Sequence, residues 1–488
     1  MSKVYSLQGI NREEQVKIAK RLTVKAETRN KGKIVYGEPF KIYSVSEDKK
    51  WISVPYYISN ELFPPHTLSY DFSDLQEDRP SMNFTSTLLE NEDRDQQTSM
   101  NEALSLLKKH HSILLALRTG YGKSICANYL ACQLKKRTLV LLCRSALLDG
   151  WKNEVQQTSS SKVVLVKSSG NTKITEETDV IISMVGRINS IDPEILASIG
   201  TLILDEAVDF CTPTHVPSVL SIHPQYIILL TATPTRPDKL DSILYDIAGP
   251  YKIVRKNQNP FTVLKLLTGY QPMTIMTEQG VDWNFLQYDL YLSPRRNQCI
   301  LDCLLLKHKD HKIMILTNFE VHVDLLVDLC EGYGLDVTRY AGKQKSYENA
   351  RILIGTTKKI GVGFDEKSKC ETFDNIRIDL LLLVCSTKQP EALAQFVGRV
   401  FRAESPNVIH FVDEDARIKG SHWRAAKKWY DSVKGEITEF HWTDPYEILD
   451  QERFNSIHTK SLQKAINTIK EKEPNHIYVK YLEGELNK

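Results

Sequence analysis

The segment Ala116–Ser124, which reads Ala-Leu-Arg-Thr-Gly-Tyr-Gly-Lys-Ser, holds the residues best suited to phosphate chemistry. Its two glycines let successive backbone N–H groups approach an anion, because neither carries a Cβ. Lys123 supplies a mobile positive charge, and Ser124 supplies a hydroxyl for Mg²⁺. A helix-like segment follows, so the positive end of its dipole would face the same anion. The alternative is an ordinary strand-to-helix turn, since Leu117 stands where the full P-loop pattern has its first glycine.

Two adjacent carboxylates, Asp205 and Glu206, end the apolar run Leu202–Leu204. Placed beside the strand of the P-loop, Asp205 would hold Mg²⁺ through its water shell, and Glu206 would orient and deprotonate an attacking water. The alternative is the solvated start of a loop. With the upstream segment, the carboxylates predict a site for Mg²⁺ and ATP. Its candidate ATP-binding residues are Thr119, Gly120, Tyr121, Gly122, Lys123 and Ser124, and its metal-binding residues are Ser124 and Asp205.

Thr231 and Thr233 flank a small residue in the stretch Leu229–Arg236. At a strand end, their hydroxyls could hydrogen-bond the neighbouring carboxylates and pass the position of these groups toward a second ligand. The alternative is a turn rich in hydroxyl side chains and closed by Pro234.

The second half of the chain contains Gln395-Phe-Val-Gly-Arg-Val-Phe-Arg402 on an expected helix that Pro390 opens. Gln395, Arg399 and Arg402 fall at i, i+4 and i+7, so a helical period places them on one face. Two guanidiniums and an amide suit a transferring γ-phosphoryl group, with one arginine as a finger. The alternative is a solvated basic helix face.

The glycine-rich stretch Gly355–Asp365 follows another apolar run. Its hydroxyls, backbone amides and two lysines could bind nucleic-acid phosphates, with Thr356 as the candidate contact. Gly363 and Asp365 are candidates for the nucleotide, where Asp365 would meet the ribose. Alone, this is a generic glycine-rich loop.

The composition is that of a globular protein whose length of 488 residues predicts two or three domains. Lys plus Arg number 63 and Asp plus Glu 61, so nucleic-acid binding would depend on local patches. Nine scattered cysteines without a C-x-x-C pair indicate reduced thiols of an intracellular protein rather than a metal site. The N-terminus is dotted with charges and the apolar runs are strand-sized, so we expect a soluble protein without a membrane partner.

Short apolar runs alternate with helical segments from about residue 100, which predicts parallel, doubly wound sheets and an α/β fold. The runs lie at 113–117, 138–142, 163–166, 180–183, 201–204 and 226–230, then at 312–316, 351–354, 379–385 and 408–412. The predicted divisions are a partly β N-terminal module (1–85), a first domain (86–250), a linker (251–295), a second domain (296–445) and a helical C-terminal tail (446–488). Asp71–Ser99 is polar and predicts a linker or exposed loop.

Taken in order, these stretches resemble the motifs of superfamily 2 helicases over about residues 96–405. Asp205–Ala207 is similar to a DEAH-type Walker B motif, Thr231–Thr233 to the coupling motif and Gln395–Arg402 to the arginine-finger motif. The resemblance places an adenine-reading glutamine at Gln96 or Gln97, of which we select Gln97. It also places a nucleic-acid contact at Arg144, and a further such motif at residues 179–185.

The resemblance implies two tandem RecA-like P-loop domains that bind ATP and Mg²⁺ between them, with Arg399 and Arg402 reaching from the second domain. It implies DNA or RNA as the partner. Arg295–Gln298, the length and the β-rich start look like the transcript-release helicases of poxviruses, asfarviruses and iridoviruses. That likeness adds RNA polymerase or other transcription factors as partners, and the host cytoplasm, its replication factories and the virion as locations. Recombination helicases of bacteriophages and eukaryotic repair translocases look similar over the motor.

Val208 departs from the pattern, because that family branch usually has a histidine there, which links hydrolysis to the coupling motif. One alternative is therefore a scaffold-type transcription or replication factor with a weak motor. Another is the motor subunit of a repair or restriction complex. The segment Ser421–Tyr430 mixes aromatic and basic residues, and either packs on the second domain or holds nucleic acid.

Overall fold

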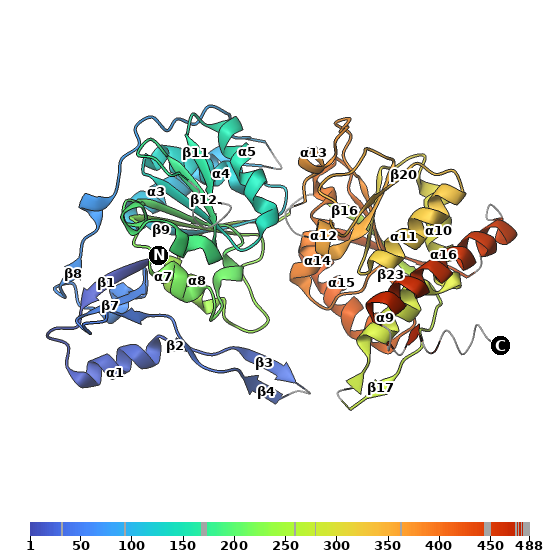
Figure 1. The fold of residues 1–488 in the computed structure, drawn as a ribbon, viewed down its shortest axis with the longest axis horizontal. Coiled ribbons are helices and arrows are strands. Elements are labelled where there is room, and N and C mark those ends of the chain that lie inside the picture. The colour runs from blue at the N-terminus through green and yellow to red at the C-terminus, as the bar shows by residue number, and fades with distance from the viewer. Residues whose placement is uncertain are drawn as a thin grey trace. The chain divides into compact units, whose positions relative to one another are not determined.

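The computed structural model describes residues 1–481 except 31–32, 92–93, 167–172, 258–259, 279, 362–363, 444–449, 474–475, 477 and 480 (Figure 1). The chain divides into two compact units, residues 1–256 and residues 257 onward, which we describe separately. In the described part of the chain, no helix is both long and apolar enough to cross a membrane.

Unit 1 is built on a parallel sheet of seven strands in the order β11-β12-β10-β13-β14-β9-β15. Side chains alternate between two hydrophobic cores: Leu139 and Leu141 of β10 enter one, and Val140 and Leu142 enter the other. Burial on both faces explains the continuous apolar runs, as predicted. The strands are β9 (Ser112–Leu117), β10 (Thr138–Leu142), β11 (Val163–Val166), β12 (Val180–Met184), β13 (Thr201–Leu204), β14 (Tyr226–Thr231) and β15 (Lys252–Arg255).

Helices cover both faces of this sheet. Those that bury residues in the core around Val140 are α3 (Gln96–His110), α4 (Lys123–Leu134) and α5 (Leu148–Thr158). Those that bury residues in the core around Leu139 are α7 (Val216–Leu220) and α8 (Ser242–Ala248). Shorter helical turns are α6 (Pro193–Ala197), η2 (Ser145–Leu147), η3 (Val185–Ser190) and η4 (Ala207–Phe210).

The N-terminal module contains an antiparallel sheet ordered β6-β7-β1-β8 and packs on unit 1. Its residues share the core around Leu139, and Ser2 donates a hydrogen bond to the Leu220 carbonyl at 2.7 Å. Module and sheet therefore fold as one unit. Its elements are β1 (Ser2–Ser6), α1 (Arg12–Arg21), β2 (Thr23–Val24), β3 (Glu27–Asn30), β4 (Lys33–Tyr36), β5 (Phe40–Lys41), β6 (Ser44–Val45), β7 (Trp51–Pro55), α2 (Ser59–Leu62), β8 (Ser69–Tyr70) and η1 (Ser73–Leu75).

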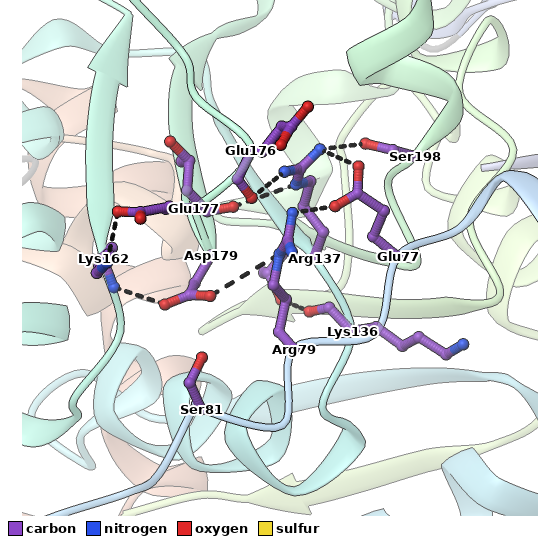
Figure 2. Close-up of polar contacts among 12 residues, drawn as sticks. Glu77, Arg79, Ser81, Lys136, Arg137, Lys162, Glu176, Glu177, Asp179 and Ser198 are labelled. Atoms are coloured by element: carbon purple, nitrogen blue, oxygen red, sulfur yellow. Dashed lines mark hydrogen bonds and ion pairs between the residues drawn. The ribbon is translucent and has the colours of Figure 1, made fainter.

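Asp71–Ser99 was predicted to be a linker or exposed loop, and its described central part is a loop, which is tied to the amino ends of β10 and β13 as an anchored strap (Figure 2). The N–H of Glu77 donates to the Ser198 carbonyl at 3.1 Å, and the N–H of Arg137 donates to the Glu77 carbonyl at 2.9 Å. Arg137, just before β10, is 3% exposed and donates to the Glu77 carboxylate at 2.6 Å and the Ser198 hydroxyl at 2.8 Å. Met82, which belongs to the strap, is fully buried. Polar composition concealed this role, because the ordering comes from Arg137, some 60 residues away.

Unit 2 repeats the design with seven parallel strands ordered β20-β21-β19-β22-β23-β16-β24. The strands are β16 (Phe261–Leu267), β19 (Ile313–Thr317), β20 (Val337–Tyr340), β21 (Ile352–Thr356), β22 (Leu380–Leu383), β23 (Asn407–Val412) and β24 (Gly435–His441). Around them lie α9 (Trp283–Leu292), α10 (Pro294–Lys307), α11 (Glu320–Gly332), α12 (Thr357–Ile360), α13 (Glu366–Lys369), α14 (Pro390–Val397), η5 (Val400–Arg402), η6 (Ala416–His422), α15 (Trp423–Ser432) and α16 (Gln451–Lys472). A small hairpin pairs β17 (Met276–Thr277) with β18 (Gly280–Val281).

The predicted linker 251–295 is not a linker. Lys252–Arg255 pairs with β9 in the first sheet, whereas Phe261–Leu267 lies between β23 and β24 in the second. The unit boundary falls at Lys256–Asn257. The C-terminal segment is helical as predicted, but α16 buries Phe454 and Ile466 in the core of unit 2, so it belongs to that domain.

The aromatic and basic segment Ser421–Tyr430 packs on unit 2. Trp423 and Tyr430 of α15 are 8% and 0% exposed and lie in a hydrophobic core of that unit. The packing interpretation of this segment is therefore confirmed.

Candidate nucleotide and nucleic-acid sites

The turn between β9 and α4 has the backbone form that the sequence predicted for a phosphate loop. Gly120 and Gly122 adopt φ angles of +79° and +98°, a region that favours glycine. A Cβ on Gly122 would lie 2.6 Å from Nε2 of Gln96 and 2.9 Å from Cγ2 of Ile125. Helix α4 begins directly at Lys123, so its unpaired N–H groups and dipole face the turn.

Gln96 supports this turn from α3. Its buried Nε2 donates to the carbonyl of Tyr121, and its Oε1 accepts from the N–H of Leu89 at 2.8 Å. Gln97, selected from the sequence, donates instead to Asn101 at 3.0 Å and to Tyr129 at 3.3 Å. The structure thus connects Gln96 with the P-loop, and Gln97 with α3 and α4.

Asp95 supports the same turn through Tyr121, whose hydroxyl donates to its Oδ1 at 2.8 Å. Arg255 of β15 donates to Asp95 at 2.8 Å. Although burial opposes the shift, the hydrogen bonds from Arg255 and Tyr121 lower the pKa of Asp95 to about 2. The carboxylate is therefore charged at neutral pH.

The two predicted carboxylates lie at the same edge of the sheet as the P-loop. Oε1 of Glu206 is 3.8 Å from Nζ of Lys123. Asp205 is 8% exposed and accepts from Nε1 of Trp151 at 2.8 Å and from the N–H of Glu206 at 3.0 Å. Burial raises the pKa of Asp205, and the charge of Lys123 and the hydrogen bond from Trp151 oppose that shift. Ser124 donates to Glu154 at 3.4 Å.

The strand order differs from the predicted arrangement of these groups. The strand that ends at Asp205, β13, does not adjoin the P-loop strand β9, because β14 lies between them. The pair Lys123 and Glu206 forms because the P-loop and the turn after β13 both extend beyond the carboxyl end of β14.

Thr231 and Thr233 end the intervening strand β14. The Thr231 hydroxyl donates to the Thr233 carbonyl at 3.0 Å and accepts the Thr233 N–H at 3.1 Å. The predicted hydrogen bond from Thr231 to a carboxylate is therefore not formed, because the hydroxyl closes its own turn.

Arg144 follows β10 and pairs with Asp209 of η4, with Nη2 3.1 Å from Oδ2. Its side chain is 46% exposed. Val208 in the same turn offers a carbonyl that accepts from Nη1 of Arg236 at 2.7 Å. The turn after the carboxylates is thus tied to residues on both sides of it in the sheet.

In unit 2, the two arginines have different surroundings. Arg399 is 7% exposed and donates to the carbonyls of Phe364 and Gly361 at 2.8 and 2.6 Å. Nη1 of Arg402 lies 2.5 Å from Oδ1 of Asp365. The predicted helix is interrupted, since α14 ends at Val397 and η5 begins at Val400. Arg399 and Arg402 nevertheless share a partner, because Nη2 of Arg402 also donates to the Phe364 carbonyl, at 3.4 Å.

Thr356 and Gly363 were the other sequence candidates in unit 2. Thr356 is buried and accepts from the N–H of Lys359 at 3.3 Å, which caps α12. Gly363 lies outside the described residues.

Four residues that contact the candidate site were not predicted from the sequence: Trp151, Asp209, Arg236 and Arg377. Trp151 bonds Asp205 from a helix 54 residues earlier, and Arg377 lies 3.5 Å from Asp365. A tryptophan N–H in an otherwise apolar helix face was the available signal, because a buried indole needs an acceptor.

Comparison with known proteins extends this picture. Residues 90–236 match the family described as type III restriction enzyme, res subunit. Protein 161L of Invertebrate iridescent virus 6, which is named as a helicase, is 29% identical over 73% of this chain and 84% of its own length. Transcript termination protein A18 of Yaba-like disease virus is 24% identical over 61% of this chain and 66% of its own.

The fold also matches a solved structure. A Dbp5 variant from S. cerevisiae, bound to Gle1 and IP6, aligns with a TM-score of 0.50 at 13% identity, over 76% of this chain and 92% of that one. Two parallel sheets, the first with a P-loop turn, define a protein of tandem RecA-like domains. In sequence the chain is similar to helicases of large DNA viruses and to a poxvirus transcript termination protein.

Proposed function

We propose that this chain hydrolyses ATP and uses the free energy to move along a nucleic-acid strand. The observation that carries the proposal is the grouping of Lys123, Asp205 and Glu206 beside a turn that needs glycine at position 122. A phosphate-binding cation, a metal-binding carboxylate and a base for water are the groups that phosphoryl transfer to water requires.

Each residue of unit 1 has a distinct role in this proposal. The backbone of Gly120 and Gly122 and the ammonium of Lys123 bind the phosphates. The Glu206 carboxylate orients a water molecule and accepts its proton as the water oxygen attacks the γ-phosphorus, while the bond from that phosphorus to the bridging oxygen breaks and ADP leaves. Thr231 and Thr233 hold the end of β14 between these groups.

Mg²⁺ fits the donor set, because the Ser124 hydroxyl and the Asp205 carboxylate are the hard oxygen ligands that it prefers. When bound with the nucleotide, Mg²⁺ neutralises charge on the phosphate oxygens. Trp151 holds one Asp205 oxygen in a fixed direction, which is the support that a metal ligand needs.

In unit 2 we assign the arginine finger to Arg402. Its guanidinium is partly exposed and pairs with Asp365, the candidate ribose contact. Arg399 has a supporting role, because its side chain is only 7% exposed and donates to the backbone carbonyls of Phe364 and Gly361. We leave Gln395 as a candidate for γ-phosphate sensing.

Nucleic acid, DNA or RNA, would be held through its phosphates by Arg144, with Thr356 and the lysines of α12 as contacts from unit 2. Such binding is independent of sequence and weakens with salt. We place the activity inside the infected cell, in its cytoplasmic replication factories and in the virion, with RNA polymerase or transcription factors as partners.

The test is phosphate release from ATP, measured with and without single-stranded DNA and RNA, followed by strand displacement on duplexes with tails of each polarity. The proposal expects release that nucleic acid stimulates. Val208 favours the alternative of a scaffold that has lost its motor, and that alternative expects no release in either condition. Nicking of plasmid DNA would favour the subunit of a restriction or repair nuclease.

A further inference from the structure

The turn η4, which begins immediately after Glu206, is where the nucleotide site meets the candidate nucleic-acid contact. Asp209 in this turn accepts a hydrogen bond from Nε of Arg144, 3.2 Å from its Oδ2, and Nη2 of the same arginine forms an ion pair with that oxygen at 3.1 Å. Arg144 belongs to the loop that follows β10, whereas Glu206 follows the neighbouring strand β13. One ion pair therefore joins the two loops.

The backbone connects Asp209 to Glu206 directly. The N–H of Asp209 donates to the carbonyl of Glu206 at 2.8 Å and closes a tight turn. Glu206 itself has a φ of +51°, a left-handed conformation that side chains other than glycine rarely adopt. Such a strained backbone conformation persists only where surrounding contacts stabilise it. The position of the Glu206 carboxylate therefore depends on the contacts that stabilise η4.

Other contacts hold the backbone of η4 in place. Arg236 donates to the Val208 carbonyl at 2.7 Å, and Asp238 holds Arg236 at 2.8 and 2.7 Å. His215 lies with Nδ1 2.9 Å from the Asp209 carbonyl. The ion pair of Arg144 is the more accessible contact, because the arginine side chain is 46% exposed and the Asp209 side chain 28%.

We propose that Asp209 is a positioning residue that reports nucleic-acid binding to Glu206. Without nucleic acid, Asp209 forms an ion pair with Arg144, and Glu206 lies beside Lys123. A phosphate group of the strand replaces Asp209 as the partner of Arg144, since guanidinium binds phosphate as readily as carboxylate. Asp209 is then released, η4 relaxes around its base at Val208, and Glu206 separates from Lys123. This inference rests on the proposed function.

The exchange makes a prediction that a simple phosphate contact does not. Asp209→Asn removes the competitor, so it should tighten binding of a labelled single-stranded oligonucleotide and raise ATP hydrolysis in its absence, each about threefold to fivefold. Arg144→Gln breaks the same pair, so it should also raise hydrolysis without nucleic acid. It should, however, weaken oligonucleotide binding. Both variants should therefore raise hydrolysis without nucleic acid, whereas Asp209→Asn should tighten oligonucleotide binding and Arg144→Gln should weaken it.

Binding is measured by fluorescence anisotropy without nucleotide at constant salt, and hydrolysis by phosphate release. Asp209→Glu, which can restore the pair, should return both properties toward the unmodified protein. Glu177→Gln is the matched control, because it breaks the exposed pair with Lys162 (2.6 Å) at the opposite edge of the sheet. It should change neither property.

Unchanged binding and hydrolysis in Asp209→Asn would overturn the inference, provided that nucleic acid stimulates the unmodified protein. Absence of any phosphate release by the unmodified protein would instead overturn the proposed function, and the inference with it. The two failures are therefore distinct.

Discussion

Lys123 and Glu206 face each other, with Nζ 3.8 Å from Oε1. The cation proposed to bind phosphate and the carboxylate proposed to activate water therefore interact with each other first. Both side chains are largely shielded, at 15% and 18% exposure, so their attraction is less screened than that of a surface pair. A bound triphosphate would replace Glu206 as the partner of Lys123, and the Glu206 carboxylate could then bind a water molecule.

Glu206→Gln should separate binding from chemistry. The amide cannot accept the proton, so kcat should fall about 10²–10⁴-fold. ATP affinity should stay the same or increase, because Lys123 loses a competing anion. Titration with a fluorescent ATP analogue and phosphate release measure the two properties. Loss of nucleotide binding together with turnover would show that Glu206 has a structural role.

Gly122→Ala should damage the phosphate loop. The new Cβ would meet Gln96 at 2.6 Å, and its φ of +98° is unfavourable for alanine by about 1–2 kcal/mol. Nucleotide binding should be lost. Gly150→Ala is the matched control, because its Cβ meets nothing within 4 Å in α5, and it should stabilise by about 0.5–1 kcal/mol. Normal ATP affinity in Gly122→Ala would contradict the assigned turn.

The two arginines of unit 2 should respond differently to alanine. Arg399→Ala leaves the buried Gly361 carbonyl without this donor and the Phe364 carbonyl with only the longer bond from Arg402 at 3.4 Å, so the free energy of unfolding should fall by about 2–4 kcal/mol. Arg402→Ala removes a partly exposed ion pair and should cost less than about 1 kcal/mol, yet it should reduce ATP turnover. Urea unfolding and phosphate release distinguish them. Equal loss of stability in both variants would contradict this division of roles.

His410 should make unit 2 sensitive to acid. Burial lowers its pKa to about 3 from the usual 6.5, and the nearby His422 adds to the shift. Below about pH 6.5 the imidazole of His410 binds a proton in the unfolded chain but not in the folded unit. The free energy of unfolding therefore decreases as the pH is lowered, by about 2 kcal/mol at about pH 5 relative to neutral pH. The loss is complete only when pH falls through the folded pKa.

His410→Gln should remove that part of the acid sensitivity, as urea unfolding at about pH 7 and about pH 5 would show. The exposed His66→Gln provides the control and should leave the pH dependence unchanged. An undiminished loss of stability in His410→Gln would mean that other groups cause it.

The sequence predicted most of both sheets, because strands buried on two faces must be apolar throughout, as in Leu139–Leu142 and Leu380–Leu383. Lys252–Arg255 was missed because this edge strand exposes part of its length and carries charge. Phe261–Leu267 was missed although it lies inside the second sheet, since Thr262 and Lys265 interrupt its apolar run. The end of α14 was also missed, because a row of spaced polar residues looks the same whether or not the helix continues past Gly398.

The individual site residues were largely recognisable, but their connections were not. Lys123, Asp205 and Glu206 have types and neighbours that indicate phosphate chemistry. The contacts of Trp151 with Asp205 and of Arg144 with Asp209 span more than 50 residues, so they depend on strand order, which local patterns do not determine.

ATP turnover by the unmodified protein and by Lys123→Ala, each with and without single-stranded nucleic acid, tests the central claim most directly. We predict phosphate release that rises with nucleic acid in the unmodified protein, and none above background in Lys123→Ala with its unfolding transition preserved. Undiminished turnover in Lys123→Ala would contradict the assignment of this loop to the triphosphate.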